Sequence, residues 1–277
     1  MRRALICANL MNPAWVEHQR QAEQLFHDLG WEASIKDDAG PLDVIVVLGG
    51  DGTLLYAAEI GRERAVPLLG VNLGHLGFLS ECDVDQLAEA IDRLDRQDFT
   101  VEERATLSMV TEQNTGWALN EITVEKENPK RMVEVLLEID GKAVSTFGCD
   151  GLVVATSTGS TGHAFSGGGP ILWPEVEALV VVPLAAHALF ARPMVVAPDS
   201  VVTITVRPDS RSGGVVACDA RRSQLIEPGQ RLEITSDKTP VRFVRFGNAP
   251  FAERLVRKFT LPVQGWRTAQ GGQTYAE

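Results

Sequence analysis

The chain has 277 residues, of which 44% are hydrophobic and 23% charged, a composition typical of a globular protein with one large domain or two ordinary ones. Lys and Arg number 26 against 37 Asp and Glu, a formal net charge of −11, which argues against nucleic acid and anionic membranes as main partners, because both need clustered cations. The four cysteines are scattered without a Cys-x-x-Cys pair, so the pattern excludes a zinc site or a disulfide framework and predicts a reducing, cytoplasmic location.

The first 98 residues alternate between strand and helix patterns. Strands are expected at 4–8, 32–35, 44–48 and 67–71, and helices at 16–29, 54–63 and 84–94. Alternation of this kind predicts a parallel sheet with crossover helices. We therefore expect residues 1–98 to form a Rossmann-like α/β nucleotide-binding domain.

A glycine-rich turn follows the most apolar of these strands. Gly49-Gly50-Asp51-Gly52-Thr53 stands between the β-branched run at 44–48 and the helix former-rich run that begins at Leu54. A strand, such a turn and a helix start form an anion-binding arrangement, because free backbone N–H groups point at the ligand. Asp51 adds a carboxylate that can bind Mg²⁺ or take a proton from an attacking hydroxyl, which suggests phosphoryl transfer. The same residues also suit a plain tight turn, and the motif occurs in lipid kinases and phosphofructokinases as well.

From residue 99 the pattern changes to short strands separated by turn residues, which predicts a β-sandwich-like domain over 99–247. Asp140-Gly141 and Pro228-Gly229 are both typical of hairpin turns. The most apolar window, 178–191, is too short to span a bilayer, so no membrane partner is expected. Residues 248–277 carry a last helix, 251–259, which we expect to return to the first domain. Strands are expected at 107–111, 117–119, 122–124, 133–139, 151–155, 201–206, 214–217, 231–235 and 241–246.

A second glycine block follows the strand at 151–155. Between Thr156 and Pro170 it offers six serine and threonine hydroxyls and several glycines. A flexible serine–glycine loop is the plain interpretation, but the strand before it and the proline after it frame it tightly. Such a loop suits a phosphate-bearing ligand.

Several motifs together resemble the NAD kinase family. They are Gly49 to Thr53, Asn72-Leu-Gly-His-Leu-Gly-Phe-Leu79, Asn120-Glu121, Asp150-Gly-Leu, Thr158-Gly-Ser-Thr161 and Gly168-Gly-Pro170. Ala191-Arg-Pro193 and the ending from Lys258 to Trp266 look similar to actinobacterial members. The resemblance covers nearly the whole chain, whereas lipid kinases share only the first motif.

The resemblance implies Mg²⁺-dependent transfer of a phosphoryl group from ATP or polyphosphate to the 2′-hydroxyl of the adenosine ribose of NAD, giving NADP. Asp51 matches the catalytic base, and no cluster for a resident metal is predicted. Asn120 and Glu121 match the pair that binds the dinucleotide, and Phe78 is expected to line the adenine pocket. The further nucleotide-binding residues that the resemblance implies are Gly49, Gly50, Gly52, Thr53, Arg131, Asp150, Ser160, Thr161, Gly162, His163 and Ser166. A homodimer or homotetramer is implied as well.

The sequence departs from the family pattern in the second glycine block and at a later position. His163 stands where a tyrosine is usual, and an imidazole offers a smaller π-surface for stacking. Ala220 replaces a frequent glycine. These departures leave two alternatives open: a paralogous kinase that acts on another nucleoside or nucleotide 2′-hydroxyl, and a catalytically weak dinucleotide-binding sensor. Retention of Asp51 speaks against the sensor, because a binding protein needs no general base.

Overall fold

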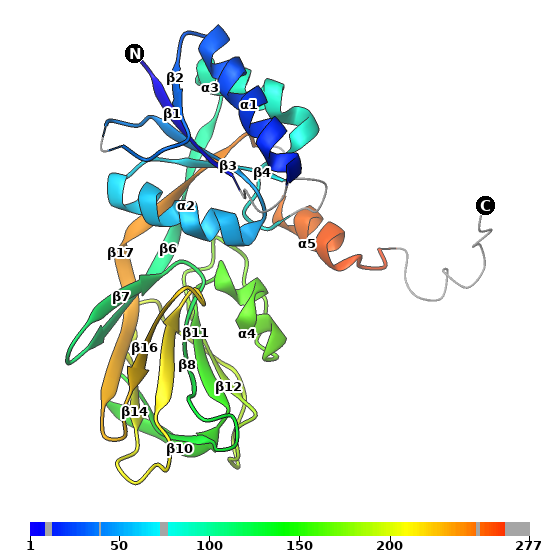
Figure 1. The fold of residues 1–277 in the computed structure, drawn as a ribbon. Coiled ribbons are helices and arrows are strands. Elements are labelled where there is room, and N and C mark those ends of the chain that lie inside the picture. Colours follow the sequence, from blue (N-terminus) through cyan, green and yellow to red (C-terminus); the bar gives the residue numbers. More distant parts are fainter. Residues whose placement is uncertain (9–12, 39, 73–76, 248–249, 264–277) are drawn as a thin grey trace. The chain divides into compact units, whose positions relative to one another are not determined.

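The computed structural model describes the chain except for residues 9–12, 39, 73–76, 248–249 and 264–277. Its contacts divide the chain into two compact units. Unit 1 comprises Met1–Glu102 and Arg242–Glu277, and unit 2 comprises Glu103–Val241. Two strands, β6 (Thr100–Thr111) and β17 (Arg231–Arg245), have residues in both units (Figure 1).

Unit 1 contains the predicted parallel sheet, in the order β2-β1-β3-β4. Every residue of β3 and β4 is buried, as expected for central strands of a parallel sheet that helices cover on both faces. The short β5 and the end of β17 also pair in parallel with β4. The strands are β1 (Arg3–Ala8), β2 (Glu32–Ser34), β3 (Val44–Leu48), β4 (Leu68–Asn72) and β5 (Cys82–Asp83).

The helices α1 (Pro13–Asp28) and α3 (Leu87–Asp95) lie together on one face of this sheet, and α2 (Asp51–Arg64) covers the other (Figure 1). Phe26 of α1 and Ile91 of α3 share a core cluster with strand residues such as Val46. A short 3₁₀ turn, Val84–Gln86, precedes α3. The last helix, α5 (Phe251–Phe259), belongs to unit 1, where Phe251 and Phe259 pack against Phe78 with ring centroids 5.7 and 5.9 Å away.

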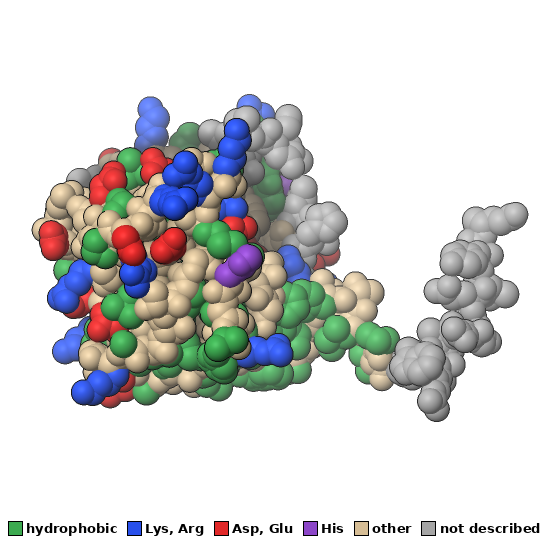
Figure 2. Space-filling view, turned by 90° about the horizontal axis from the view of Figure 1, so that it is seen from below, with side chains coloured by type: hydrophobic (Ala, Val, Ile, Leu, Met, Phe, Trp, Pro, Cys, Tyr) green, Lys and Arg blue, Asp and Glu red, His purple; other side chains and the backbone are tan. Residues whose placement is uncertain are grey.

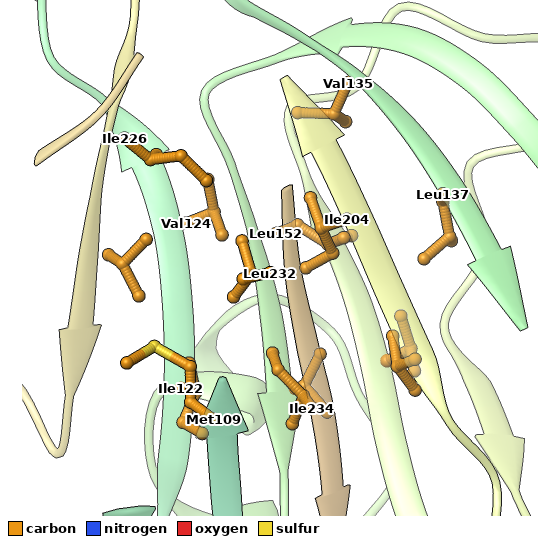
Figure 3. Close-up of a cluster of buried hydrophobic side chains, with 14 of the residues drawn as sticks. Met109, Ile122, Val124, Val135, Leu137, Leu152, Ile204, Ile226, Leu232 and Ile234 are labelled. Atoms are coloured by element: carbon orange, nitrogen blue, oxygen red, sulfur yellow. The ribbon is translucent and has the colours of Figure 1, made fainter. Parts of the chain in front are cut away.

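Unit 2 is built from two antiparallel sheets, which confirms the predicted β-rich domain. One sheet has the order β13-β12-β11-β8-β15-β16, and the other contains β10-β9-β14-β17, with β6 paired to β17 and β7. Figure 3 shows their inward side chains, among them Ile122, Leu152 and Ile204, which form one core between the sheets. The strands are β7 (Thr115–Ala118), β8 (Glu121–Lys126), β9 (Val133–Ile139), β10 (Lys142–Cys149), β11 (Gly151–Ala155), β12 (Leu179–Leu184), β13 (Met194–Val196), β14 (Val202–Val206), β15 (Gly214–Cys218) and β16 (Arg222–Ile226).

Four strands of unit 2 were not predicted from the sequence, and three of them are edge strands. β10, β13 and β16 stand at the ends of their sheets, where half-exposed strands carry only a weak hydrophobic pattern. The fourth, β12, lies within the apolar window 178–191, and its first four residues are buried. The strands predicted at 231–235 and 241–246 are one continuous strand, β17.

Of the two predicted hairpin turns, one forms a hairpin and the other does not. Asp140 and Gly141 both have positive φ, 52° and 69°, and join β9 to β10 as a two-residue hairpin. Pro228-Gly229 also forms a turn, but it connects β16 to β17, which belong to different sheets. The second pair is therefore a link between the sheets and not a hairpin.

Charged side chains of both signs are interspersed on the face drawn in Figure 2, which agrees with the mixed but net acidic composition. None of the helices in the described part of the chain is long and apolar enough to cross a membrane.

Candidate functional site

The Gly49–Thr53 turn presents bare backbone at the carboxyl end of β3. A Cβ on Gly49 would lie 2.5 Å from Thr53 Oγ1, so the close turn requires glycine there. Gly50 caps α2 without a side chain, and its carbonyl accepts hydrogen bonds from the N–H groups of Thr53 and Leu54 at 2.9 and 3.2 Å. The helix therefore begins at Asp51, three residues earlier than predicted. The sequence pattern missed this first turn because Gly52 has a low helix propensity.

This early start places Asp51 in the first turn of a helix, where the macrodipole favours a negative charge. The residue is half-buried, and its Oδ1 is buried without a hydrogen-bond partner among the described residues. Burial raises the pKa of the carboxyl group, while the positive charge of Lys258 and the backbone N–H of Leu79 act in the opposite direction. A carboxylate with a raised pKa is a stronger base than an exposed one.

Gly77 lies directly against this carboxylate. A Cβ built on Gly77 would be 2.3 Å from Asp51 Oδ1, closer than atoms can approach. The neighbouring N–H of Gly77 donates to Ser80 Oγ at 3.1 Å, so this segment has a fixed shape. Residues 73–76 of the predicted 72–79 motif lie outside the described residues.

Phe78 is more enclosed than expected for a residue that lines a ligand pocket. Its side chain is packed against α5, and the residue is only 8% exposed. Most of the ring surface already contacts protein, which leaves little of it for a ligand. The expected contact with adenine stays a prediction.

In unit 2, Asn120 and Glu121 are held by Asp219, which the sequence did not single out. The Asp219 carboxylate accepts hydrogen bonds from the N–H groups of Leu119, Asn120 and Glu121, at 2.9, 2.7 and 3.3 Å. Asp219 and Ala220 both have a φ of 52°, so the chain turns through the left-handed region there. That geometry explains why glycine is frequent at position 220 in the family pattern. The family glycine was the sequence signal that residues 219–220 form a turn with positive φ.

The Glu121 carboxylate is the most perturbed acid of unit 2. The residue is 6% exposed, and its Oε2 has no hydrogen-bond partner among the described residues. Burial, with the negative charges of Asp219 and Glu125, raises its pKa to about 7, although the backbone N–H of His163 acts in the opposite direction. A buried acceptor without a donor is costly, so this group is suited to receive a hydroxyl hydrogen bond from a ligand.

The second glycine block packs directly on this pair. Thr156 Oγ1 donates to the carbonyl of Leu119 at 2.7 Å, and its N–H donates to the carbonyl of Asn120 at 2.9 Å. A Cβ on Gly159 would lie 2.0 Å from Asn120 O, so only glycine allows this approach. The block then forms a 3₁₀ turn, Gly159–Thr161, and one helical turn, α4 (His163–Ser166).

The predicted residues of this block differ in what they can offer a ligand. Ser160 is fully buried, and its Oγ bonds to Ser157 O at 2.6 Å and to Leu172 N at 2.9 Å, so its hydroxyl shapes the loop and is not presented outward. Thr161, Gly162 and His163 are half-buried, and Ser166 is exposed. A Cβ built on Gly162 would lie 3.5 Å from Glu121 Oε2, and the backbone N–H of His163 also interacts with this carboxylate, so the loop passes beside Glu121 at these two residues.

Arg131 and Asp150 lie away from Glu121 within unit 2. Asp150 precedes β11 and pairs with Lys126 at 2.6 Å, whereas Glu121 faces the opposite end of β11. Those ends are about 13 Å apart at the usual rise of a strand. Arg131 is exposed in the turn between β8 and β9 and donates to Arg211 O at 3.4 Å. Their binding roles stay predictions.

Among the residues with described positions, none of the His, Cys, Asp and Glu side chains form a group of three or more that could hold a metal ion. The Asp51 carboxylate, whose Oδ1 has no partner in the described part of the chain, suits an ion that arrives with substrate phosphates, as Mg²⁺ usually does. Besides Asp219, the sequence did not predict Gly77 and Lys258 beside Asp51, because only the folded chain brings them together.

Comparison with known proteins gives a consistent result. The family model of the ATP-NAD kinase N-terminal domain matches residues 14–99, and that of the ATP-NAD kinase C-terminal domain matches residues 119–246. The chain is 56% identical over 241 residues to an NAD kinase of Thermobifida fusca, covering 83% of this chain and 73% of that protein. It is 50% identical over 230 residues to an NAD kinase of Mycobacterium tuberculosis, covering 81% and 75%.

Two solved structures resemble the fold. One is an NAD kinase from Archaeoglobus fulgidus in complex with ATP, with a TM-score of 0.76 and 26% identity, covering 94% of this chain and 100% of that chain. The other is a yeast NADH kinase complexed with NADH, with a TM-score of 0.78 and 20% identity, covering 100% of this chain and 90% of that one.

Proposed function

Because this chain belongs to the NAD kinase family, we propose that it transfers the γ-phosphoryl group of ATP to the 2′-hydroxyl of the adenosine ribose of NAD, giving NADP and ADP. The observation that carries the proposal is Asp51. It is a half-buried carboxylate with a raised pKa, its Oδ1 has no hydrogen-bond partner among the described residues, and it follows a glycine turn at a helix N-terminus. That combination supplies a base beside an anion-binding backbone.

Asp51 acts as the general base in this proposal. It takes the proton of the 2′-hydroxyl as that oxygen forms its bond to the γ-phosphorus, and the bond from phosphorus to the β–γ bridging oxygen breaks to release ADP. The raised pKa favours the proton transfer, because the acceptor becomes more basic. A positioned base of this kind contributes about 10²–10⁴ in rate.

The donor phosphates are assigned to the Gly49–Thr53 turn. Gly50 and Gly52 are exposed, and no atom of the described residues lies within 4 Å of a Cβ built on either, so a phosphate can approach the backbone there. When bound with ATP, Mg²⁺ would supply positive charge to the phosphoryl oxygens. Asp51 is the protein carboxylate in this turn that could contact the ion. The archaeal relative named above was solved with ATP, which supports ATP over polyphosphate as the donor.

The dinucleotide is assigned to Asn120 and Glu121. The support is the buried Oε2 of Glu121, which no described residue hydrogen-bonds, and the hydrogen bonds by which Asp219 and Thr156 hold the pair in place. Ribose hydroxyls donate well to a carboxylate, and an amide both donates and accepts. Thr161, Gly162, His163 and Ser166 are assigned to the surrounding ligand surface, with His163 the residue most able to alter acceptor preference.

The test is to incubate the purified chain with Mg²⁺, NAD and either ATP or polyphosphate, and to measure NADP. Asp51→Asn should lose about 10²–10⁴ in kcat while the fold and NAD binding persist. Asn120→Ala should weaken use of NAD by roughly 1–3 kcal/mol and leave the KM for ATP nearly unchanged. Phosphorylation of another nucleoside in preference to NAD would favour the paralogous kinase, and NAD binding without turnover would favour the sensor.

We also infer a cytoplasmic homo-oligomer. All four cysteines are free thiols, which suits a reducing compartment. Leu189 and Phe190 are fully and largely exposed apolar residues beside the edge strand β13, and a contact between copies would cover them. Light scattering on the purified chain distinguishes a monomer from a dimer or tetramer.

A further inference from the structure

Arg254 is the buried residue of α5, a helix whose other side chains are exposed or half-buried. The arginine is 6% exposed. Its Nη1 donates to the carbonyl of Ser80 at 2.6 Å and to that of Phe78 at 3.4 Å, and its Nη2 pairs with Glu81 Oε2 at 2.8 Å. A buried cation is retained only with such partners, so the position of this side chain is strongly specified.

Glu81 anchors the arginine from the other side. Its side chain is 3% exposed and also pairs with Arg245 at 3.2 Å, while its Oε1 accepts the N–H of Phe246 at 2.8 Å. Arg245 in turn donates to the carbonyl of Leu79 at 3.2 Å. Three consecutive backbone carbonyls, those of residues 78, 79 and 80, therefore accept hydrogen bonds from the buried Arg254 and the partly buried Arg245.

These carbonyls belong to the segment that lies against Asp51. The carbonyl of Phe78 and the N–H of Leu79 are the two ends of one peptide group. Arg254 holds the oxygen end, and the N–H end stabilises the Asp51 carboxylate. A cation at the oxygen end polarises the peptide group and strengthens its N–H as a donor. Gly77, one residue before this peptide group, touches Asp51 Oδ1.

We propose that Arg254, fixed by Glu81, is a positioning residue that holds the 77–80 segment against Asp51 and so sets the place and basicity of the catalytic carboxylate. This inference rests on the proposed role of Asp51 as base. It makes α5, the last helix of the described chain, a part of the catalytic apparatus, although Arg254 is not among the residues assigned to either substrate.

Among the described residues, the charged groups that face this region are Lys258, on the same helix, and a cluster behind the 77–80 segment. The cluster consists of Glu81, Arg245 and Arg254, together with Glu102, which also pairs with Arg245. Loss of Arg254 removes support for the ionised form of Asp51 without touching the residues assigned to NAD. The effect should therefore appear in kcat and in the acid limb of its pH profile, while the KM for NAD stays near the wild-type value.

The experiment compares wild type, Arg254→Met, Arg254→Lys and Arg3→Met in NADP formation between pH 5 and 9, with thermal unfolding of each. Arg254→Met should lose roughly 10–100-fold in kcat, the usual cost of misplacing a reacting group, and its acid limb should move to higher pH. Arg254→Lys keeps a positive charge beside Ser80 O and should recover part of both. Arg3 is a matched control, since it is also a buried, ion-paired arginine of unit 1 and lies away from residues 77–81. Arg3→Met should lower thermal stability and leave the kcat and the acid limb of the folded enzyme unchanged.

A folded Arg254→Met variant with wild-type kcat and acid limb would overturn the inference, as would a loss that Arg3→Met reproduces. Should Arg254→Met fail to fold, Arg254→Lys and Glu81→Gln decide, and wild-type profiles in both would overturn it. Asp51→Asn separates the two proposals. If that variant stays active, the assignment of the base fails; if it is inactive while Arg254→Met is normal, only the positioning role fails.

Discussion

Gly77→Ala should impair catalysis while leaving the fold almost untouched. The new Cβ would lie 2.3 Å from Asp51 Oδ1, and ordinary contact begins at 3.4 Å, so the carboxylate oxygen must move by about 3.4 − 2.3 = 1.1 Å. The displaced atom is the end of a side chain, and Gly77 does not have positive φ, so alanine itself is tolerated. A misplacement of about 1 Å in a reacting group costs on the order of 10²-fold in rate.

The assay is steady-state NADP formation with saturating NAD and ATP, together with thermal unfolding. We expect kcat to fall by roughly 10–100-fold while the melting temperature changes little. Gly148→Ala is the matched control, because its Cβ would meet the flexible Met132 Sδ at 3.3 Å in unit 2. That variant should keep the wild-type kcat.

A double-mutant cycle gives the decisive comparison. In an Asp51→Asn background the Gly77→Ala change should have no further effect on kcat, because the group that it displaces no longer acts as a base. Wild-type kcat in Gly77→Ala, or the same loss with and without the Asp51 carboxylate, would refute the argument that this contact sets the position of the base.

Three further predictions concern single side chains. Glu121→Gln should unfold at a higher temperature than wild type at pH 8 but not at pH 4.5. The reason is that the pKa of Glu121 is raised from 4.5 to about 7 in the folded protein, so the free energy of unfolding falls by roughly 3 kcal/mol as the pH rises between those values. Glutamine does not ionise and therefore avoids this loss. A difference that does not depend on pH, or the same gain in the exposed control Glu125→Gln, would contradict this. Lys258→Met should move the acid limb of kcat to higher pH, because the positive charge of Lys258 lowers the pKa of Asp51, and an unmoved limb at low salt would show that the charge does not reach the carboxylate. His163→Tyr should tighten NAD by roughly 0.5–1.5 kcal/mol if residue 163 stacks on the ligand, and calorimetric titration of NAD into both proteins that gives equal affinities would exclude that contact.

The predictions from the sequence succeeded where a pattern is local and repeated. The β-branched run at 44–48 and the apolar spacing of Leu87, Ile91 and Leu94 each specify an element without help from distant residues. Edge strands such as β10 and β16 were not predicted, because half their surface faces solvent and the hydrophobic alternation fades. The start of α2 was misplaced for a related reason: Gly50 and Gly52 oppose a helix locally, and the packing of Leu54, Ala57 and Ala58 against the sheet overrides them.

The sequence alone determined the chemical character of the chain. A glycine turn with one acid after a buried strand, an Asn-Glu pair and a hydroxyl-rich block identify the kind of ligand and reaction, because those residue types act through short-range chemistry that spacing reveals. Only the tertiary structure decided the environment of each group. The burial that raises the pKa values of Asp51 and Glu121, the contact of Gly77 with the base, and the Arg254–Glu81 pair behind it join residues up to 173 positions apart. Contacts of that range depend on how helices and strands pack, and a linear pattern carries no record of them.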